Sequence, residues 1–411
     1  MEEVEIPSYF LCPISLQIMK DPVTLSTGIT YDRDAIERWL LSGDAKCCPM
    51  TKQRVPPESE LTPNHTLRRL IQAWCTLNTS NGIERFPTPK PPVDRARIAA
   101  LLDEAKQAPT QMKALKSLKL VVAESERNKK LVESTPGAVE ILASIISNSK
   151  SSSPRDEYEY EITATDEALH ILYSLQLSEQ SLIGLIEKNS NFIQALTVTL
   201  QRSSYQSRTH ALLLLKSIVG VISPSRLIRM GEDLLHEIVN VLRDQISLHA
   251  TKAALHVLAG VSPWGRNRIK IVNAGAVPVL VDMLLEDSDR RVCEAALVVL
   301  DRVCGCAEGR AAVAAQAAGI AVVAKKIIRV SPAASERAVG VLHSVCKYSA
   351  TAAVLQEMVQ VGVVGKLCLV LQSDQCGVKT KEKAREILRL HARVWKASPC
   401  LSPQFLAFYP S

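Results

Sequence analysis

The sequence is poor in aromatic residues and in glycine. Aromatic side chains make up 4% of the 411 residues, and glycine and proline occur 17 and 21 times. These values exclude collagen-like and low-complexity chains, and they suit helices packed through Leu, Val and Ala better than a β-sandwich. Hydrophobic residues reach 47% and charged residues 22%, so the composition also excludes disorder across the whole chain.

Long runs of like charge are absent as well. The net charge is +7, but no block of five like charges occurs, and residues 1–80 contain eight Lys or Arg against ten Asp or Glu. The surplus of positive charge therefore lies in the rest of the chain. A basic charge spread in this way fits a solvated helical surface better than a groove that follows a phosphate backbone, so we expect no nucleic-acid partner.

The sequence also lacks a long apolar run and a signal sequence. The longest run of small apolar residues, 311–324, is interrupted by Gln316 and falls short of the roughly 20 residues that span a bilayer. The first residues are acidic, where a signal peptide needs positive charge. The eleven cysteines form no paired framework, which favours reduced thiols. We therefore expect an intracellular protein without stable membrane insertion, in the cytoplasm or, as a second candidate, in the nucleus.

A proline-rich segment separates two unlike regions of the chain. Four prolines occur at 87–92, and consecutive X-Pro units favour extended backbone and exclude helix. The predicted parts are a small module at 6–78, a linker at 79–95, a long region at 96–396 with a Ser-rich surface insertion at about 147–161, and a tail at 397–411.

The long region repeats every 42 to 44 residues. Glycines at 275, 319 and 362 recur in this phase, and so do pairs of a small and a bulky residue. The pairs are Ala168-Leu169, Ala211-Leu212, Ala254-Leu255, Ala296-Leu297 and Ala338-Val339. A period of this length is typical of repeat proteins with two or three helices in each unit.

One unit shows why the repeats are helical. Apolar residues within 277–284 and 292–303 recur at i, i+3, i+4 and i+7, which is the spacing of an amphipathic helix. Ser288 or Asp289 can cap the second helix, and Gly319 can end a short helix at 310–318 with a positive φ. Each unit is thus predicted as a short helix followed by two longer ones. Such a unit cannot bury both of its faces alone, so neighbouring units must stack into a solenoid with a long concave surface.

This arrangement resembles armadillo repeats in six or seven units, and the resemblance implies an all-α right-handed superhelix. Many armadillo proteins bind an extended peptide through Trp and Asn residues on the third helix of each unit. The positions that match the Asn hold Ser174, Ser217, Gly260, Arg302 and Ser344, and those that match the Trp hold His170, Leu213, His256, Val298 and Gly340. We therefore do not expect the peptide-binding mode of nuclear import receptors.

Residues 6–78 predict a compact α+β unit. Thr27-Gly28 is a turn signal between two short apolar runs, which predicts a hairpin. Asp32 or Asp34 can cap a first helix, and Asn64 can cap a second one. A chain of about seventy residues can bury one small core.

The module lacks the close Cys and His pairs of a structural zinc site, which needs four nitrogen or sulfur donors for each ion. Cys12 is followed at the usual spacing by Ser15, and no Cys or His occurs from 13 to 46. We therefore expect no metal and no other cofactor, and we expect hydrogen bonds to brace the module instead. The candidate bracing residues are Asp21, Thr24, Ser26, Asp32, Arg33 and Thr51.

The motifs of the module resemble the U-box, the zinc-free relative of the RING domain. They are IPSYFLCPIS at 6–15, DPV at 21–23, GITYDR at 28–33, IERWL at 36–40, CPMT at 48–51, and LTPN followed by LRRLI within 61–71. A U-box followed by armadillo repeats is similar to plant U-box E3 ubiquitin ligases, and especially to the subgroup that damps immune and drought responses. The resemblance thus implies a small α+β U-box (RING-like, zinc-free) followed by an all-α armadillo solenoid.

In that family the U-box docks a ubiquitin-conjugating enzyme, or E2, that carries ubiquitin. The resemblance implies that Ile14 is the apolar knob of the first loop, with Cys12 and Pro13 beside it. It also implies contacts from Trp39 on the first helix and from Pro49 on the second loop. The armadillo groove is implied to bind the protein substrate.

The residue pattern itself supports Trp39 as a docking residue. An i, i+4 spacing turns Ile36 and Leu40 inward and leaves Trp39 facing a different surface, where a large aromatic side chain is characteristic of a recognition anchor. The alternative interpretation is that Trp39 packs against the hairpin.

The resemblance implies no covalent step and no catalytic residue. A reactive thiol needs a neighbouring His and acid to lower its pKa, and neither is discernible around Cys12. The E3 is implied instead to orient the charged E2 towards an acceptor lysine. Lys52 matches a cation that bridges ubiquitin and the E2. Many relatives have Arg at this position, and Lys lacks the planar fork with which Arg binds two oxygens.

Three classes of function are open at this point. The first is an E3 ubiquitin ligase, in plant immune and abiotic-stress signalling. The second is a non-enzymatic armadillo scaffold with an inactive U-box, and the third is a basic solenoid that docks to nucleic acid or lipid through residues 379–396. The presence of all the residues implied for E2 docking favours the first class. Glu382 and Glu386 alternate with the basic residues of 379–396, which indicates a solvated end helix.

Two further features concern regulation. Thr62 and Thr88 each precede a proline, which is the minimal signature of proline-directed kinases. Phosphate on Thr62 would add negative charge near a helix start and alter packing or self-association of the U-box. The alternative is that both Thr-Pro pairs are ordinary turn sequence.

Overall fold

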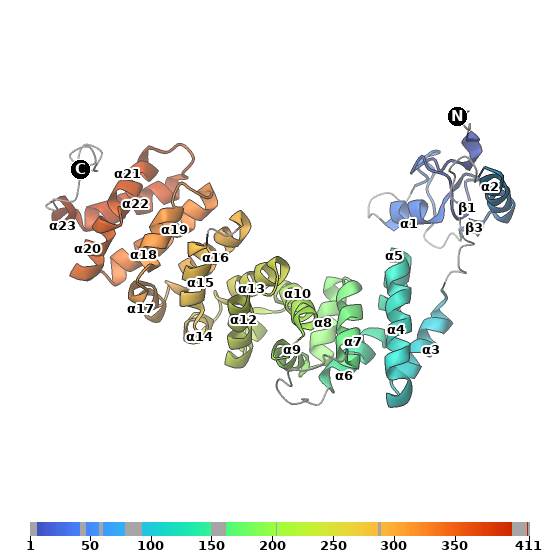
Figure 1. Ribbon diagram of the computed structural model, residues 1–411, viewed down its shortest axis with the longest axis horizontal. Coiled ribbons are helices and arrows are strands. Elements are labelled where there is room, and N and C mark those ends of the chain that lie inside the picture. The colour runs from blue at the N-terminus through green and yellow to red at the C-terminus, as the bar shows by residue number, and fades with distance from the viewer. Residues whose placement is uncertain are drawn as a thin grey trace. The chain divides into compact units, whose positions relative to one another are not determined.

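A computed structural model describes residues 6–41, 47–56, 61–78, 93–148, 162–202, 204–286, 289–396 and 409. They belong to two compact units, Met1–Ala138 and Val139–Ser411 (Figure 1). Most of the predicted linker at 79–95, of the insertion at 147–161 and of the tail at 397–411 lies outside the described residues.

The first unit begins with a three-stranded antiparallel sheet in the order β2-β1-β3. A 3-10 helix and the strands are η1 (Ser8–Phe10), β1 (Pro22–Thr24), β2 (Thr30–Asp32) and β3 (Thr62–Pro63). Val23 of β1 lies opposite Tyr31 of β2. The predicted hairpin is confirmed, because the Leu25 N–H donates to the Ile29 carbonyl at 3.0 Å and Gly28 turns the chain at φ +81°.

Two helices contact this sheet. They are α1 (Arg33–Leu41) and α2 (His65–Leu77). Asn64 caps α2 as predicted, because its side chain accepts the Leu67 N–H at 3.0 Å. Asp32 does not serve as a helix cap. Its carboxylate accepts the N–H groups of Lys20 and Asp21 instead, each at 2.8 Å.

The core of this module joins the sheet, the helices and the loops between them. Its buried members are Phe10, Cys12, Met19, Val23, Leu25, Tyr31, Ala35, Ile36, Cys48, Val55, Ile71 and Cys75. Cys12 and Cys48 come from loops, so the loops are fixed to the same core as the helices. The first unit ends with α3 (Arg95–Ala105), α4 (Ala108–Glu124) and α5 (Glu126–Glu133).

Helices make up the rest of the described chain. They are α6 (Ala138–Ser147), α7 (Ala164–Ser174), α8 (Glu179–Lys188), α9 (Phe192–Leu200), α10 (Tyr205–Val221), α11 (Pro224–Ile228), α12 (Glu232–Asp244), α13 (Leu248–Val261), α14 (Asn267–Asn273), α15 (Ala276–Leu285), α16 (Arg290–Val303), α17 (Ala307–Ala315), α18 (Gly319–Lys326), α19 (Pro332–Tyr348), α20 (Ala352–Gln360), α21 (Val363–Gln372), α22 (Val378–Leu390) and α23 (Ala392–Lys396). None of these helices by itself is long and apolar enough to cross a membrane, among the residues described. Only α20 and α21 together reach that length and hydropathy, with a bend of 66° between them.

The third helices of successive units pack side by side. Helix α10 contacts α13, α13 contacts α16, α16 contacts α19, and α19 contacts α22. The second helices α12, α15, α18 and α21 each pack on the third helix of their own unit. The predicted short helix followed by two longer ones is confirmed for α14, α15 and α16. The third helices therefore form one continuous layer of the second unit (Figure 1).

The predictions for the helix ends were partly right. Asp289 caps α16, because it accepts the N–H groups of Arg291 and Val292 at 2.9 and 3.3 Å, whereas Ser288 lies outside the described residues. The prediction that Gly319 ends a helix with a positive φ is wrong, because Gly319 is the first residue of α18 and has no positive φ. Glycine is needed there for a different reason: a Cβ would lie 2.3 Å from the Val313 carbonyl oxygen.

Two of the positions that lack the Trp and Asn pattern hold glycines in close contact with the neighbouring third helix. A Cβ on Gly260 of α13 would lie 2.5 Å from Val219 Cγ1 on α10. A Cβ on Gly340 of α19 would lie 2.4 Å from Asp301 Oδ1 on α16. A larger residue at either position would thus require a side chain of the neighbouring third helix to shift.

Candidate functional site

Two loops of the N-terminal module share sequence and backbone geometry. Loop one is CPISLQ at 12–17, and loop two is CPMTKQ at 48–53. In each loop the first N–H donates to the sixth carbonyl at 2.8 Å, and the fifth N–H donates to the first carbonyl at 2.8 or 2.9 Å. The fifth residues, Leu16 and Lys52, have φ of +56° and +58°. This repeat was not predicted, although the pattern C-P-x-S/T-x-Q marks it in the sequence.

Both loops are anchored on neighbouring residues of β2. The Asp32 N–H donates to Cys12 Sγ at 3.3 Å, and the Tyr31 hydroxyl lies 3.0 Å from Cys48 Sγ. The Tyr31 oxygen also accepts the Met50 N–H at 3.3 Å, which leaves the hydroxyl hydrogen for the sulfur. Two adjacent residues of β2 thus hold both loops.

The two cysteines support the loops from the inside. Both side chains are 0% exposed, so Cys12 has no side-chain surface for its predicted E2 contact. Burial raises the pKa of the Cys48 thiol, but hydrogen bonds from Thr27, Thr51 and Tyr31 outweigh burial and bring the pKa to about 6. Burial and the hydrogen bond to Cys48 raise the pKa of the Tyr31 hydroxyl. The sulfur atoms thus act as enclosed hydrogen-bond acceptors.

The other predicted docking residues keep part of their surface exposed. Ile14 and Trp39 pack half-buried against the module core, and Pro13 and Pro49 are half-buried in their loops. Trp39 Nε1 donates to the Cys47 carbonyl at 2.9 Å, directly before loop two. Trp39 was predicted to face a surface other than the core. It instead packs partly on the core, and its indole N–H holds the residue before loop two.

Two apolar residues that were not predicted extend this surface. Leu16 in loop one is 75% exposed, and Met50 in loop two is 60% exposed. Exposed apolar side chains on loops of fixed conformation are typical of a recognition surface. Lys52 follows in loop two and is exposed. We call these residues together the docking patch: Ile14, Leu16, Trp39, Pro49 and Met50.

A charged cluster braces the module next to β1. Asp21 accepts Arg33 Nε, at the start of α1, at 2.6 Å, and it also binds Arg68 Nη2 from α2. The three side chains are only 14 to 17% exposed. The predicted bracing by Asp21, Asp32 and Arg33 is confirmed. Arg68 was not predicted, since it lies 47 residues from Asp21 and no local pattern links them.

Two of the three remaining bracing candidates form side-chain hydrogen bonds. Thr24 Oγ1 lies 2.9 Å from Thr30 Oγ1 across the hairpin, and Thr51 Oγ1 accepts the Gln53 N–H at 3.5 Å. Ser26 has no side-chain hydrogen bond to any described residue. In the described part of the chain, no group of three or more His, Cys, Asp or Glu side chains is placed to hold a metal ion.

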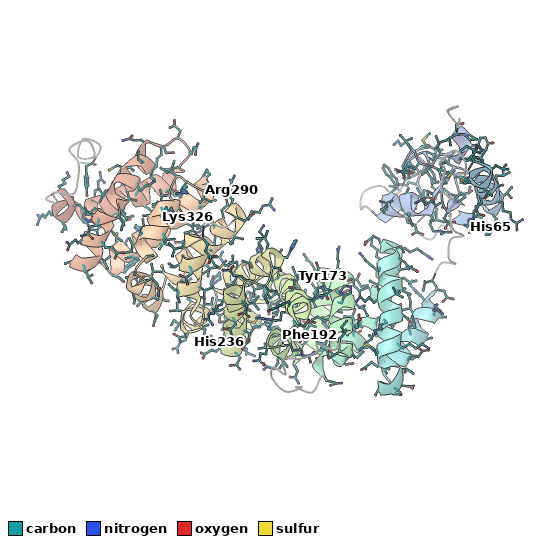
Figure 2. All side chains as sticks on the ribbon, in the orientation of Figure 1. His65, Tyr173, Phe192, His236, Arg290 and Lys326 are labelled. Atoms are coloured by element: carbon teal, nitrogen blue, oxygen red, sulfur yellow. The ribbon has the colours of Figure 1, made fainter. Side chains whose placement is uncertain are left out.

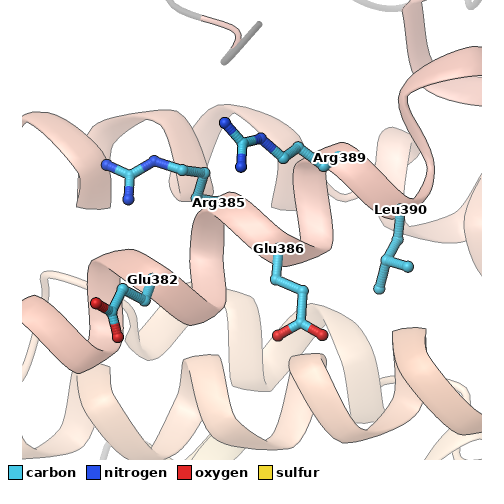
Figure 3. A pocket seen from close by; sticks show the side chains of 5 residues that line it. All are labelled: Glu382, Arg385, Glu386, Arg389 and Leu390. Carbon is cyan, nitrogen blue, oxygen red and sulfur yellow. The ribbon is translucent and has the colours of Figure 1, made fainter.

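The second unit has a pocket of about 450 Å³ on α22. Its lining residues are Glu382, Arg385, Glu386, Arg389 and Leu390 (Figure 3). Lys347 Nζ donates to Glu386 at 2.9 Å, and His343 Nε2 lies 2.8 Å from the same carboxylate. These hydrogen bonds lower the pKa of Glu386. Glu386 is therefore paired with cationic and imidazole groups of α19, and acidic and basic side chains alternate along α22 as the sequence indicates for a solvated end helix.

Comparison with known proteins assigns both parts of the chain. Residues 6–80 match the U-box domain family, and residues 97–409 match the plant U-box protein ARM repeat region. The chain is 52% identical to "E3 ubiquitin-protein ligase PUB23" of Arabidopsis thaliana, covering 100% of this chain and 98% of the relative. It is 49% identical to "E3 ubiquitin-protein ligase PUB22" of the same species, covering 100% of both. The predicted fold, a U-box followed by armadillo repeats, is confirmed.

Among solved structures, the chain is similar to one from a study of the interaction between cadherin and beta-catenin. The TM-score is 0.60 at 15% sequence identity, covering 80% of this chain and 59% of the other. At this level of identity the likeness concerns the fold alone.

Proposed function

This chain belongs to the plant U-box proteins with armadillo repeats, and we propose that its docking patch holds a ubiquitin-charged E2 while its armadillo helices bind the substrate. The chain is thus an E3 ubiquitin ligase, as its relatives PUB23 and PUB22 are named. The observation that supports E2 docking is the pair of matching loops on β2, with Ile14, Leu16 and Met50 at their surface. A setting in plant immune and abiotic-stress signalling is part of the proposal and follows only from the family resemblance.

The proposed mechanism needs no covalent intermediate on the ligase. The thiols of Cys12 and Cys48 are enclosed, and their role in the loops is to accept hydrogen bonds. The U-box accelerates transfer by holding the charged E2 in one orientation, so that an acceptor lysine meets the thioester in an effectively intramolecular reaction. Loops of fixed conformation suit this role because little entropy is lost when they bind.

A reconstituted reaction tests this proposal. The purified chain is incubated with E1, E2, ubiquitin and ATP, and ubiquitin conjugates of the chain are followed with time. Conjugates that require both the E2 and the chain are the expected result. An E2 that binds to the docking patch without forming conjugates would point to the non-enzymatic scaffold with an inactive U-box.

Lys52 is proposed to bridge ubiquitin and the E2 through its charge. Lys52→Gln removes the charge and shortens the side chain by one atom, so we expect discharge of ubiquitin from the E2 to free lysine to slow about tenfold. Lys52→Arg should match or exceed the original rate, because its fork can bind two oxygens at once. Equal rates for the Gln and Arg variants would show that the charge at this position plays no part.

We further propose that phosphate on Thr62 regulates the U-box, together with Thr88, which lies outside the described residues. Thr62 is exposed in β3, directly before the Asn64 cap of α2. Leu70 and Leu77 of α2 are 52% and 81% exposed, which supports α2 as a surface for self-association of the U-box.

A phosphomimetic pair tests this regulation. Glu at Thr62 and Thr88 is expected to change the oligomeric state and, severalfold, the ligase rate, compared with Ala at both positions, because negative charge is added near the start of α2, whose free N–H groups favour anions. Light scattering and the reconstituted reaction measure the two effects. If neither the oligomeric state nor the ligase rate differs between the Glu pair and the Ala pair, the proposed regulation is contradicted.

A further inference from the structure

A serine-proline pair of the second unit, Ser223-Pro224, differs from all the similar pairs of the chain. The sequence contains nine Ser-Pro or Thr-Pro pairs, and only Ser223-Pro224 has a Lys or Arg three residues after the hydroxyl residue, namely Arg226. Proline-directed kinases read the proline that follows the acceptor residue, and many of them also read a basic residue at this third position. The spacing therefore fits such a kinase at Ser223 better than at any other pair.

Exposure separates the described pairs further. Among the serines that precede a proline, Ser262 is 0% exposed and Ser331 is 8% exposed, whereas Ser223 is exposed. Thr135 is buried as well, and Thr62 is exposed but has no Lys or Arg at the third position. All four residues from 223 to 226 are exposed. The motif that fits the kinase best is therefore also accessible at the surface.

The ordinary reason for a Ser-Pro pair is the start of a helix, because serine is a good cap and proline fits the first helical position. Ser331 follows this rule, since its Oγ accepts the Ala334 N–H at 3.0 Å at the start of α19. Ser223 precedes α11 but makes no such bond, and its Oγ lies 3.0 Å from Ser225 Oγ instead. The helix start thus explains Pro224 and leaves the Ser223 hydroxyl available.

Helix α11 is a small obstacle to a kinase, which binds its substrate segment in an extended form. The helix has only five residues, and so short a helix has little stability of its own. Its buried residue is Leu227, four positions after Ser223. Ser223 itself already has extended backbone, with φ −64° and ψ 150°. Opening the turn as far as Arg226 therefore exposes no core side chain.

Two cations follow Ser223 and have no acidic partner. Residues 221–231 contain Arg226 and Arg229 and no Asp or Glu, and neither arginine forms an ion pair with a described carboxylate. Arg226 donates from Nη1 to the Ile186 carbonyl of α8 at 3.0 Å. This carbonyl lies in the last turn of α8, where the helix itself supplies no partner. The bond therefore joins α11 to the short first helix of the preceding unit.

We propose that Ser223 is phosphorylated by a proline-directed kinase and that the phosphate takes Arg226 away from the Ile186 carbonyl. Ser223 Oγ bonds to the γ-phosphorus of ATP, the bond from that phosphorus to the β–γ bridging oxygen breaks, ADP leaves, and the hydroxyl proton passes to a base of the kinase. Side chains at i and i+3 are neighbours, so the phosphate lies within reach of Arg226. A phosphate carries about −2 charge and can accept two bonds from one guanidinium, whereas the carbonyl is neutral.

The bond to Ile186 is one of a series between first helices. Asn267 of α14 donates to the Leu227 carbonyl of α11 at 2.8 Å, 40 residues back, as Arg226 does to Ile186. Phe192, four residues after the end of α8, is fully buried, and Figure 2 shows it within the second unit. Helix α8 thus stays attached to the core when the bond is lost. The expected effect is a local loosening of α8 against α11, without unfolding of the unit.

A kinase assay on the full chain tests the site. The probe is a cyclin-dependent kinase, which reads both the proline and the basic residue, with ATP and Mg²⁺, and mass spectrometry locates the phosphate. Ser223 should be phosphorylated at least about tenfold faster than Ser262 and Ser331, because both of these are buried and need local unfolding first. Ser223→Ala should abolish the fast reaction, and the matched control Ser225→Ala should retain it. Equal rates at the three serines, or no phosphate on Ser223, would overturn the proposal.

Hydrogen exchange tests the change of partner. In the phosphorylated chain, amides of the last turn of α8 should exchange severalfold faster than in the unphosphorylated chain, while peptides from α19 should keep their protection. Arg226→Ala without kinase should show the same faster exchange in α8, because it removes the same bond. Ser223→Ala treated with the kinase is the control and should keep the slow exchange. Unchanged exchange in α8 with Ser223 fully phosphorylated would contradict the proposed change of partner. Neither experiment needs E2 or ubiquitin, so both are independent of the proposed ligase function.

Discussion

Trp39→Ala is expected to abolish measurable E2-dependent ubiquitination while the armadillo helices remain folded. Trp39 contributes exposed aromatic surface to the docking patch and holds loop two through the Cys47 carbonyl, at 2.9 Å. Truncation of an aromatic hot spot costs at least about 2 kcal/mol of binding free energy, which weakens the affinity about thirtyfold. An E2 that binds weakly to begin with would then no longer bind measurably. Titration of the E2 against the variant measures the loss directly.

The dual role of Trp39 calls for two companion variants. Ile14→Lys changes only a loop side chain that packs at the edge of the core, and it should lose E2 binding with little change in melting temperature. Leu120→Ala removes an apolar residue of α4 that is 68% exposed and should leave E2 affinity unchanged. Full activity in both Trp39→Ala and Ile14→Lys would show that E2 docks elsewhere.

Asp21→Ala is expected to unfold the U-box. Asp21 is the shared partner of Arg33 and Arg68, and all three side chains are at most 17% exposed. Removing one partner from an enclosed charge cluster leaves the others without compensation and costs about 3 kcal/mol or more. A module of this size is only marginally stable, so this loss is enough to open it.

Hydrogen exchange on the full chain measures this effect. Peptides from β1 and β2 should lose their protection in Asp21→Ala, while peptides from α13 and α16 should keep it. Asp34→Asn is the control, because Asp34 is exposed in the first turn of α1 and contributes at most about 1 kcal/mol through the helix dipole. Unchanged protection of β1 in Asp21→Ala would refute the view that this cluster replaces a metal as the brace.

Much of the fold could be predicted because it depends on local patterns. Helix spacing, the caps at Asn64 and Asp289, and the turn at Gly28 each involve residues close together in the sequence. The prediction for Gly319 failed because two physical reasons select glycine. A positive φ and a close backbone contact look the same in a sequence, and only the second applies there.

The site was harder to predict because its parts meet across long stretches of chain. Ile14, Trp39 and Pro49 were named from family resemblance, and the structure leaves all three with exposed or half-buried surface. The burial of Cys12 and the contact of Arg68 with Asp21 depend on tertiary packing that no local pattern reports. Leu16 and Met50 could have been found, since the repeated C-P-x-S/T-x-Q pattern places both loops in the same conformation.

The most direct test of this account is a single-turnover measurement of ubiquitin discharge. An E2 thioester is formed, E1 is quenched, and release of ubiquitin to free lysine is timed with and without the purified chain. The account predicts that the chain accelerates discharge and that Ile14→Lys removes the acceleration. Discharge at the same rate with and without the chain, for E2 enzymes that bind it, would contradict the account.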